Sequence, residues 1–182
     1  MIYIMRHGKT DWNKEYRLQG RTDIPLNDEG REMAVEAREL YKDVHFDVCY
    51  CSPLSRARET AEIFLKDRED VPIHIDDRLI EMSFGVCEGE DHIFSKPESG
   101  VYKLFKDPEN YEVVEGAESF DQLYSRTGDF LNHVAKPLSD EGKDVLIVGH
   151  GAMNTSIICQ ARGIPLKDFW SVGIENCKLF EL

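Results

Sequence analysis

Two histidines in this chain stand at positions where an imidazole could do chemistry. His7 follows Arg6 directly after the apolar run 2–5, and His150 follows Gly149 after the predicted buried strand 144–148. An imidazole can act as a nucleophile or carry a proton near neutral pH, and arginine binds the oxygens of an anion through paired hydrogen bonds. These residues therefore indicate chemistry on an anionic group.

A third segment adds a second arginine. Arg56 follows an apolar run at 46–51 by one turn of a predicted helix. Parallel strands place their carboxyl ends at one sheet edge, so two imidazoles and two guanidinium groups would meet there. That cluster is costly unless an anion neutralises it, and a phosphoryl group fits the donors. Alone, Arg56 could be one charge on a solvated helix face beside Arg58 and Glu59. Together, the three strand ends predict a phosphate site.

The elements that would position these residues alternate between strands and helices. We expect strands at 2–5, 46–51, 72–75 and 144–148, with an edge strand at 177–182. Helices are expected between them, and one after His150 should run to about Arg162. This order predicts an α/β fold: a three-layer α/β/α sandwich with a mostly parallel central sheet.

Three helix starts can be predicted from capping residues. Asn27 is the expected N-cap of a helix of about four turns. Ser52 and Pro53 have the residue types of an N-cap and first helical position. Ser119 and Gln122 form a capping-box pattern before a helix that should reach about residue 136.

The pattern breaks down from about residue 82 to 118, apart from an expected helix near 101–106. Long irregular insertions in compact domains are usually functional. We therefore expect one domain, residues 1–182, with this segment inserted as a cap over the site.

Composition limits the possible partners. The net charge of −13 predicts repulsion from nucleic acid and anionic membranes. No apolar run approaches the roughly 18 residues of a membrane span, and we expect a cytoplasmic protein. The five cysteines are an odd number for a disulfide framework and have no zinc-ligand spacing, and we expect Cys49 and Cys51, which lie in an apolar run, to be buried thiols. We expect neither metal nor cofactor. The edge-like last strand would permit a homodimer.

The chain resembles the histidine phosphatase superfamily, also called phosphoglycerate mutase-like, in the correct order over nearly its whole length. The matching segments are residues 6–13, 18–30, 51–61, 79–89 and 148–151. The resemblance implies that His7 accepts the phosphoryl group and that Glu81 is the nearby general acid. It implies that Arg6, Arg56 and His150 hold the phosphoryl oxygens, and it adds these phosphate-binding residues: Gly8, Asn13, Gln19, Gly20 and Gly151.

The family includes phosphatases and mutases, and the cap favours a phosphatase. The resemblance implies that a mutase would carry arginines in the cap and a tyrosine where this chain has Phe84. Here, no arginine lies between Arg78 and Arg126, and residues 86–118 hold nine acids against three lysines. Such a cap is poorly suited to a second phosphate or a carboxylate. We therefore expect a small phosphomonoester as the substrate, with phosphoglycerate mutase activity as the alternative.

Two other classes of protein fit the sequence less well. A module that only binds phosphorylated ligands should lack His7 or Glu81, and both are present. A cysteine-dependent phosphatase places arginine six residues after the cysteine, whereas Arg56 follows Cys51 by five and Cys49 by seven. The role of the cap aromatics stays open between a leaving-group wall and packing of the cap: Phe84, Phe94, Tyr102, Phe105 and Tyr111.

Overall fold

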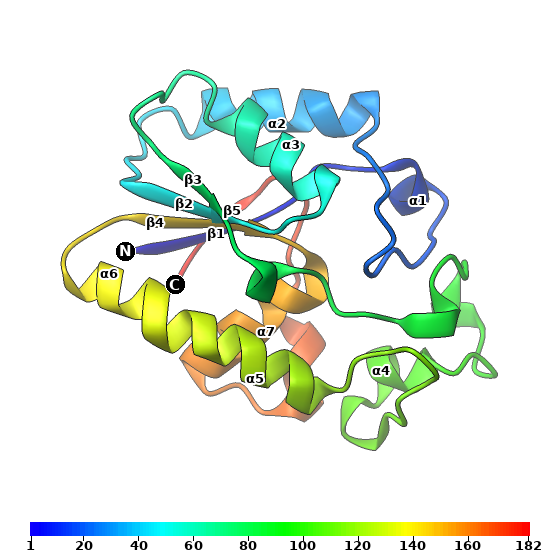
Figure 1. Ribbon diagram of the computed structural model, residues 1–182. Helices are drawn as coiled ribbons and strands as arrows, with labels where there is room; N and C mark the ends of the chain where they lie inside the picture. The colour runs from blue at the N-terminus through cyan, green and yellow to red at the C-terminus, as the bar shows by residue number, and fades with distance from the viewer.

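The computed structural model describes residues 1–182 and is built on a five-stranded sheet (Figure 1). Across the sheet the strand order is β3-β2-β4-β1-β5, and only β5 is antiparallel to its neighbour. The mostly parallel sheet and the terminal edge strand are confirmed. The strands are β1 (Ile2–Arg6), β2 (Val48–Cys51), β3 (Ile73–Ile75), β4 (Val145–Gly149) and β5 (Leu179–Glu181).

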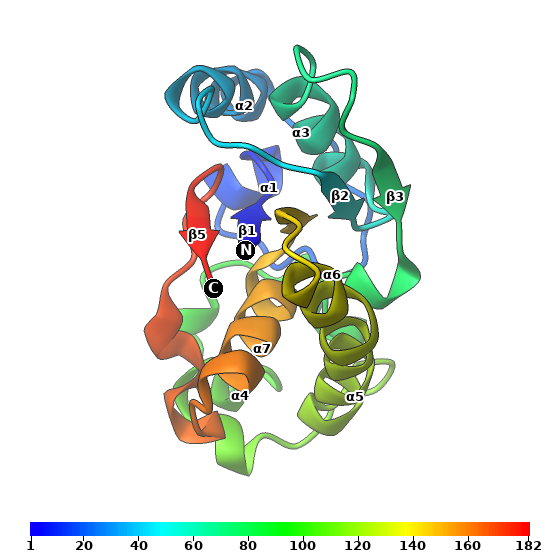
Figure 2. The ribbon, with the colours of Figure 1, turned by 90° about the vertical axis from the view of Figure 1, so that its left-hand side faces the viewer.

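Helices cover both faces of the sheet (Figure 2). One face packs against α2 (Asp28–Leu40) and α3 (Ser55–Phe64), and the other against α5 (Phe120–Phe130), α6 (Lys136–Asp140) and α7 (Gly151–Arg162). Side chains alternate between the faces, as strand geometry requires: Met5 lies in the α2–α3 core, and Ile4 lies in the core with α5 and α7. The predicted three-layer sandwich is confirmed.

Two of the three predicted helix starts are correct. The Asn27 side chain accepts the Gly30 N–H at 2.8 Å as the N-cap of α2. Ser119 and Gln122 form the predicted capping box of α5. In each case a side-chain oxygen satisfies a backbone donor that the first helical turn leaves free.

The prediction for Ser52 and Pro53 was wrong. Helix α3 begins at Ser55, and its N-cap, Leu54, has no side chain that can accept a hydrogen bond. Asp23 supplies the acceptor instead, because its Oδ1 lies 2.9 Å from the Ser55 amide. Ser52 is thereby left outside the helix, at the carboxyl end of β2.

The helix that starts at Ser119 extends beyond the predicted end. It continues through a π-helical turn, Leu131–Ala135, into α6, which contains Pro137. Proline lacks an amide hydrogen and its ring crowds the preceding turn of an α-helix, and a π turn relieves both problems.

The cap segment consists of short elements that pack against α5 and α7. These are the 3-10 turns Gly85–Cys87, Ile93–Ser95 and Pro108–Asn110, together with α4 (Tyr102–Lys106). Leu104 of α4 lies in one apolar cluster with Leu123 of α5 and Phe169 of the 3-10 segment Leu166–Val172. The cap is therefore tied to the core by burial and not only by its two ends.

No helix is long and apolar enough to cross a membrane. All five cysteines are buried free thiols, which confirms the expectation for Cys49 and Cys51.

Candidate active site

The predicted meeting of strand ends is present at the carboxyl edge of the sheet. Arg6 pairs with Gly149 in the register of β1 and β4, and the His7 amide donates to the Gly149 carbonyl at 2.9 Å. This register brings the rings of His7 and His150 to a centroid separation of 5.2 Å. Both histidines are buried.

The environment of His7 prepares it for nucleophilic attack. Its Nδ1 lies 2.6 Å from the Gly8 carbonyl, which can only accept, so Nδ1 carries the hydrogen and Nε2 keeps its lone pair. Burial lowers the pKa of His7 well below its usual range, and the nearby charges of Arg56 and Arg6 lower it further. The ring is therefore neutral near pH 7.

His150 is held by a residue that sequence reasoning missed. Its Nε2 lies 2.6 Å from the Ser52 hydroxyl, directly after β2. Burial lowers the pKa of His150 well below its usual range, and the charge on Arg56 adds to this. The position of Ser52 at a strand end was a signal for the site, but its residue type also fitted a helix cap.

Two arginines, the buried Arg56 and the partly buried Arg6, supply positive charge. The Arg56 side chain is about 1% exposed, and it donates to the carbonyls of Thr22 (2.8 Å) and Gly20 (2.6 Å). Burial lowers the pKa of Arg56 to about 10, which still leaves it charged. Arg6 donates to the Ile174 carbonyl at 3.3 Å. The Nε atoms of both arginines and the Nδ1 of His150 are buried without a protein acceptor or donor.

The side chain of Glu81, which precedes the cap in sequence, contacts the N-terminal turn of α7. Its carboxylate accepts the amides of Met82 (2.8 Å), Met153 (2.9 Å) and Ala152 (3.2 Å). It is 7% exposed and lines the same cavity as His7. The hydrogen bonds fix its orientation, and the helix N-terminus contributes partial positive charge beside it.

Asn13 and Gln19 are positioned by Thr10, the N-cap of the short helix α1 (Asp11–Lys14). Asn13 Oδ1 accepts the Thr10 amide at 3.1 Å, and Gln19 Oε1 accepts the Thr10 hydroxyl at 2.7 Å. With their oxygens occupied in this way, both side chains retain amide N–H groups as donors, and both line the cavity. Thr10 and α1 were not predicted.

The three predicted glycines have different roles in the structure. Gly20 has a φ of +53° and lines the cavity, and its carbonyl accepts from Arg56. Gly151 also lines the cavity, between Arg6 and Glu81. Gly8 lies outside the lining: its amide donates to the Thr60 hydroxyl at 3.0 Å, and a Cβ there would be 2.4 Å from the Gly30 carbonyl oxygen. Its contact with the site is the carbonyl that orients His7.

These residues share a cavity of about 650 Å³. The predicted site residues Arg6, His7, Arg56 and Glu81 line it, while His150 adjoins His7 and lies outside the lining. Phe84, Phe94 and Phe105 line it as well, whereas Tyr102 and Tyr111 do not. Tyr16 and Trp170 join this lining and were not predicted.

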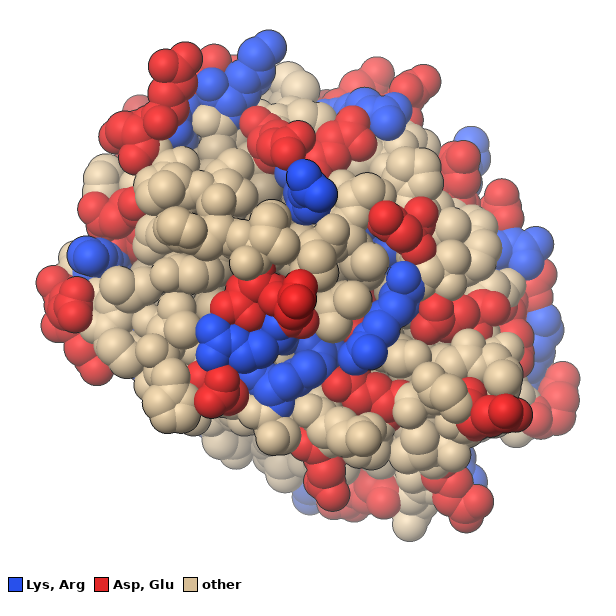
Figure 3. Space-filling view, viewed as in Figure 1, with Lys and Arg blue, Asp and Glu red and all other residues tan.

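A larger open hollow of about 850 Å³ lies over α5 and the two ends of the cap segment. Figure 3 shows basic side chains gathered there among acidic ones. They are committed to partners: Arg126 binds both oxygens of Glu118, and Arg78 pairs with Asp76 and Asp129. Its charges are therefore already neutralised, and Arg21 connects it to the site by donating to the Glu81 carbonyl at 3.1 Å.

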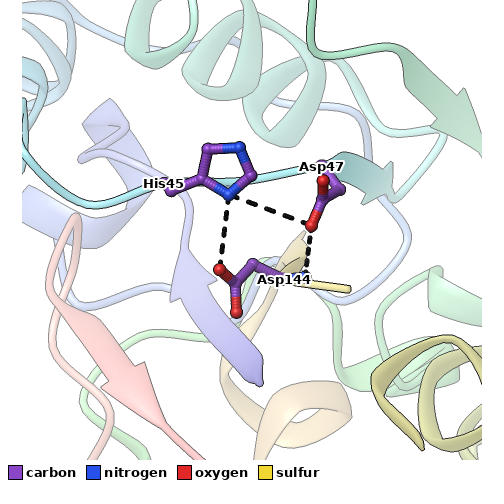
Figure 4. Close-up of side chains that lie close together, drawn as sticks. All are labelled: His45, Asp47 and Asp144. Atoms are coloured by element: carbon purple, nitrogen blue, oxygen red, sulfur yellow. Dashed lines mark hydrogen bonds and ion pairs between the residues drawn. The ribbon is translucent and has the colours of Figure 1, made fainter. Parts of the chain in front are cut away.

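A cluster of His45, Asp47 and Asp144 lies at the opposite edge of the sheet, near the amino ends of β2 and β4 (Figure 4). His45 Nδ1 is 3.3 Å from Asp144 Oδ2, and Asp47 Oδ2 accepts the Asp144 amide at 2.7 Å. The N-terminal amine pairs with Asp144 at 3.2 Å. The histidine is 67% exposed and the acids have local partners, so we read the cluster as a surface ion-pair group.

A neutral, oriented imidazole beside the buried Arg56 and the partly buried Arg6, at the carboxyl edge of a mostly parallel sheet, is typical of enzymes that transfer phosphoryl groups. Comparisons with known proteins agree. The model of the histidine phosphatase superfamily (branch 1) matches residues 2–182. The chain belongs to this superfamily, and it is an enzyme of the phosphoglycerate mutase-like family.

Relatives are found among both sequences and solved structures. The chain is 30% identical to "Phosphoserine phosphatase 1" of Hydrogenobacter thermophilus over 96% of this chain and 82% of the relative. It is 33% identical to "Probable 2-carboxy-D-arabinitol-1-phosphatase" of Arabidopsis thaliana. This match covers 97% of this chain but only 36% of that relative. The solved structure of Bacillus stearothermophilus YhfR has 32% identity and a TM-score of 0.84, with 98% of this chain and 88% of that chain covered.

Proposed function

We propose that this protein is a metal-independent phosphomonoester hydrolase that works through a phosphohistidine on His7. The observation that carries the proposal is the state of that ring. His7 is neutral and buried, its Nδ1–H is bound to the Gly8 carbonyl, and it adjoins Arg6 and Arg56. The remaining lone pair on Nε2 is the one available for attack on phosphorus.

In the first step, Nε2 of His7 forms a bond to phosphorus as the bond from phosphorus to the alcohol oxygen breaks. The leaving oxygen takes a proton from Glu81 and departs as the alcohol. In the second step, water attacks the phosphohistidine, gives a proton to Glu81, and releases phosphate and the free imidazole. Arg6, Arg56 and His150 stabilise the charge that gathers on the three equatorial oxygens.

The unpartnered atoms around His7 support binding of a phosphoryl group. Nε of Arg6 and Nε of Arg56 are donors without acceptors in the protein, and burial of an unsatisfied donor costs roughly 1–3 kcal/mol. A bound phosphate would provide acceptors for such donors. Their positive charge also offsets the charge of the substrate, so no metal ion is needed for that purpose.

The cavity favours hydrolysis over the mutase reaction. Beyond Arg6 and Arg56, it is lined by only two further cations, Arg17 and Lys106. Arg17 is already bound to the Glu15 carboxylate and the Gly89 carbonyl. A sugar-acid phosphate that must be held while it reorients would need a second strong anion site, and the cap offers aromatic rings there instead.

The thiol alternative is disfavoured by burial. Cys51 is completely buried, and burial raises its pKa to about 12. A thiol with this pKa is protonated near neutrality and is a poor nucleophile.

The test of the proposed function is release of phosphate from a panel of phosphomonoesters by His7→Gln and by His45→Gln, a matched change of an exposed histidine. We expect His7→Gln to lower kcat at least about hundredfold and His45→Gln to leave it unchanged. Residual activity of His7→Gln within about tenfold of wild type would overturn the assignment of the nucleophile. Conversion of primed phosphoglycerate at a rate comparable to hydrolysis would establish the mutase reaction instead.

A further inference from the structure

Two aromatic side chains are unusually exposed, and both belong to the active-site cavity. Tyr16 is 70% exposed and Phe94 is 63% exposed, while the other large hydrophobic residues with high exposure are aliphatic or methionine. Tyr16 follows α1, and Phe94 lies in the Ile93–Ser95 turn of the cap, so two separate segments place an aromatic ring at one cavity. Exposed aromatic rings gathered at one site indicate a surface that a ligand covers.

Further aromatic rings continue this surface into the cavity. Phe105 lies 5.4 Å from Phe94 and 4.9 Å from Trp170, measured between ring centroids, and Phe84 lies 6.0 Å from Phe105. The Trp170 indole donates to the Leu104 carbonyl at 2.7 Å, which fixes the ring plane. The inner rings are thus held in place by packing and hydrogen bonding before any ligand arrives.

Two residues that line the cavity have a strained backbone conformation. Tyr16 has a φ of +57° and His92 a φ of +49°, and only one other residue apart from glycine, Cys177, has a positive φ. The His92 amide donates to the Tyr16 carbonyl at 3.0 Å, and the two rings lie 5.2 Å apart. Strain of this kind persists where the surrounding structure enforces it, and it is concentrated at functional sites.

We infer that the leaving group of the natural substrate carries a flat aromatic ring, which binds against Tyr16, Phe94 and Phe105. This inference rests on the proposed function, because the ring is placed relative to a phosphate held at His7. Aromatic side chains bind flat apolar groups by stacking and edge contacts as well as by burial. The cavity of about 650 Å³ has room for a phosphate and a ring system together.

An aromatic surface could also bind a cationic leaving group, but the positively charged side chains of this cavity disfavour one. Lys106 lies 4.8 Å from the Phe94 ring centroid and pairs with no carboxylate. Arg17 also lines the cavity, and Glu81 is the only acid in the lining. A quaternary ammonium group would therefore meet positive charge beside the rings that would otherwise attract it.

The test compares three phosphomonoesters: benzyl phosphate, ethyl phosphate and phosphocholine. Benzyl alcohol and ethanol are of similar acidity, so a difference between their esters reports binding of the ring and not departure of a better leaving group. We expect kcat/KM for benzyl phosphate to exceed that for ethyl phosphate by at least about tenfold, the effect of burying one face of a ring. Phosphocholine should be no better than ethyl phosphate.

Two variants localise the preference. Phe94→Ala should reduce kcat/KM for benzyl phosphate about fivefold or more, and it should change ethyl phosphate by less than about twofold. Val86→Ala is the control, because Val86 is a 66% exposed cap residue outside the cavity lining. It should leave both substrates unchanged. Equal losses on both substrates in Phe94→Ala would overturn the subsite.

The failure of this inference can be separated from failure of the proposed function. Hydrolysis of all three esters without preference for the benzyl ester would end the inference and leave the hydrolase intact. If no ester is hydrolysed, calorimetric titration with benzylphosphonate and ethylphosphonate decides. Tighter binding of the benzyl compound that is lost in Phe94→Ala would support the aromatic subsite, although the proposed function would have failed. Equal binding of the two compounds would refute the subsite. Preference for phosphocholine would replace the aromatic ligand with a cationic one.

Discussion

The two buried histidines should make the free energy of unfolding depend on pH. In the unfolded chain each titrates near pH 6.5, and in the folded protein burial and the arginine charges hold both pKa values well below this. Between these pKa values the unfolded state binds more protons than the folded state. The contribution of the two histidines to the free energy of unfolding is therefore complete above pH 6.5 and is lost as the pH falls below that value. From pH 7.5 to 5.5 each histidine then contributes a loss on the order of 1 kcal/mol, and the pair roughly 2–3 kcal/mol.

The measurement is urea unfolding at several pH values in this range, for wild type, His150→Gln and the double variant His7→Gln/His150→Gln. We expect wild type to lose roughly 2–3 kcal/mol, the single variant on the order of 1 kcal/mol, and the double variant little. Each protein is compared with itself across pH, so a change in overall stability caused by the substitution does not matter. Inorganic phosphate should reduce the wild-type dependence, because an anion at the site favours protonated imidazole.

A wild-type profile that stays flat from pH 7.5 to 5.5 would show that the imidazoles are not held neutral by their surroundings. An equally steep profile in the double variant would assign the dependence to other groups. Either result would refute the electrostatic reasoning about His7.

Three further predictions concern single residues of the site. Glu81→Gln should slow phosphoenzyme formation from benzyl phosphate at least about hundredfold and from p-nitrophenyl phosphate far less, because nitrophenolate leaves without a proton; equal losses in rapid-quench measurements of this step would contradict the acid role. In Gly151→Ala the new Cβ would lie 3.7 Å from Arg6 Cζ and 3.8 Å from Glu81 Oε2, ordinary contact distances. The protein should fold, but its inhibition by vanadate should weaken about tenfold, equivalent to about 1.4 kcal/mol. Unchanged inhibition would show that the bound anion does not lie against Gly151. Cys51→Ala should keep kcat within about twofold of wild type in a phosphate-release assay, and abolished turnover in a folded variant would point to a thiol mechanism.

The sequence was most informative where a pattern is local or repeats. Apolar runs and capping residues located the sheet and α2, and the strand ends predicted that His7 and His150 would meet. The relation of Glu81 to His7 came from the family resemblance alone. In the structure this residue is fixed by amides of α7, about 70 positions further along the chain.

The remaining features depend on contacts between distant segments. Asp23 caps α3 from another loop, which freed Ser52 to contact His150, and no spacing within residues 52–56 indicates this. Tyr16 and Trp170 flank the cap in space but lie outside it in sequence, so a search confined to residues 82–118 could not find them. Gly8 fitted a phosphate-binding pattern, yet the tight approach of Gly30 gave it a packing role.

The central claim is a covalent bond between His7 and phosphorus, and trapping that intermediate tests it most directly. The enzyme would be mixed with phosphate-labelled substrate, quenched rapidly in alkali, digested and mapped by mass spectrometry. We expect one phosphoryl group on His7, stable in alkali and lost in acid, and none in His7→Gln. Label on His150 or Cys51, or turnover with no labelled enzyme at any time, would contradict the mechanism.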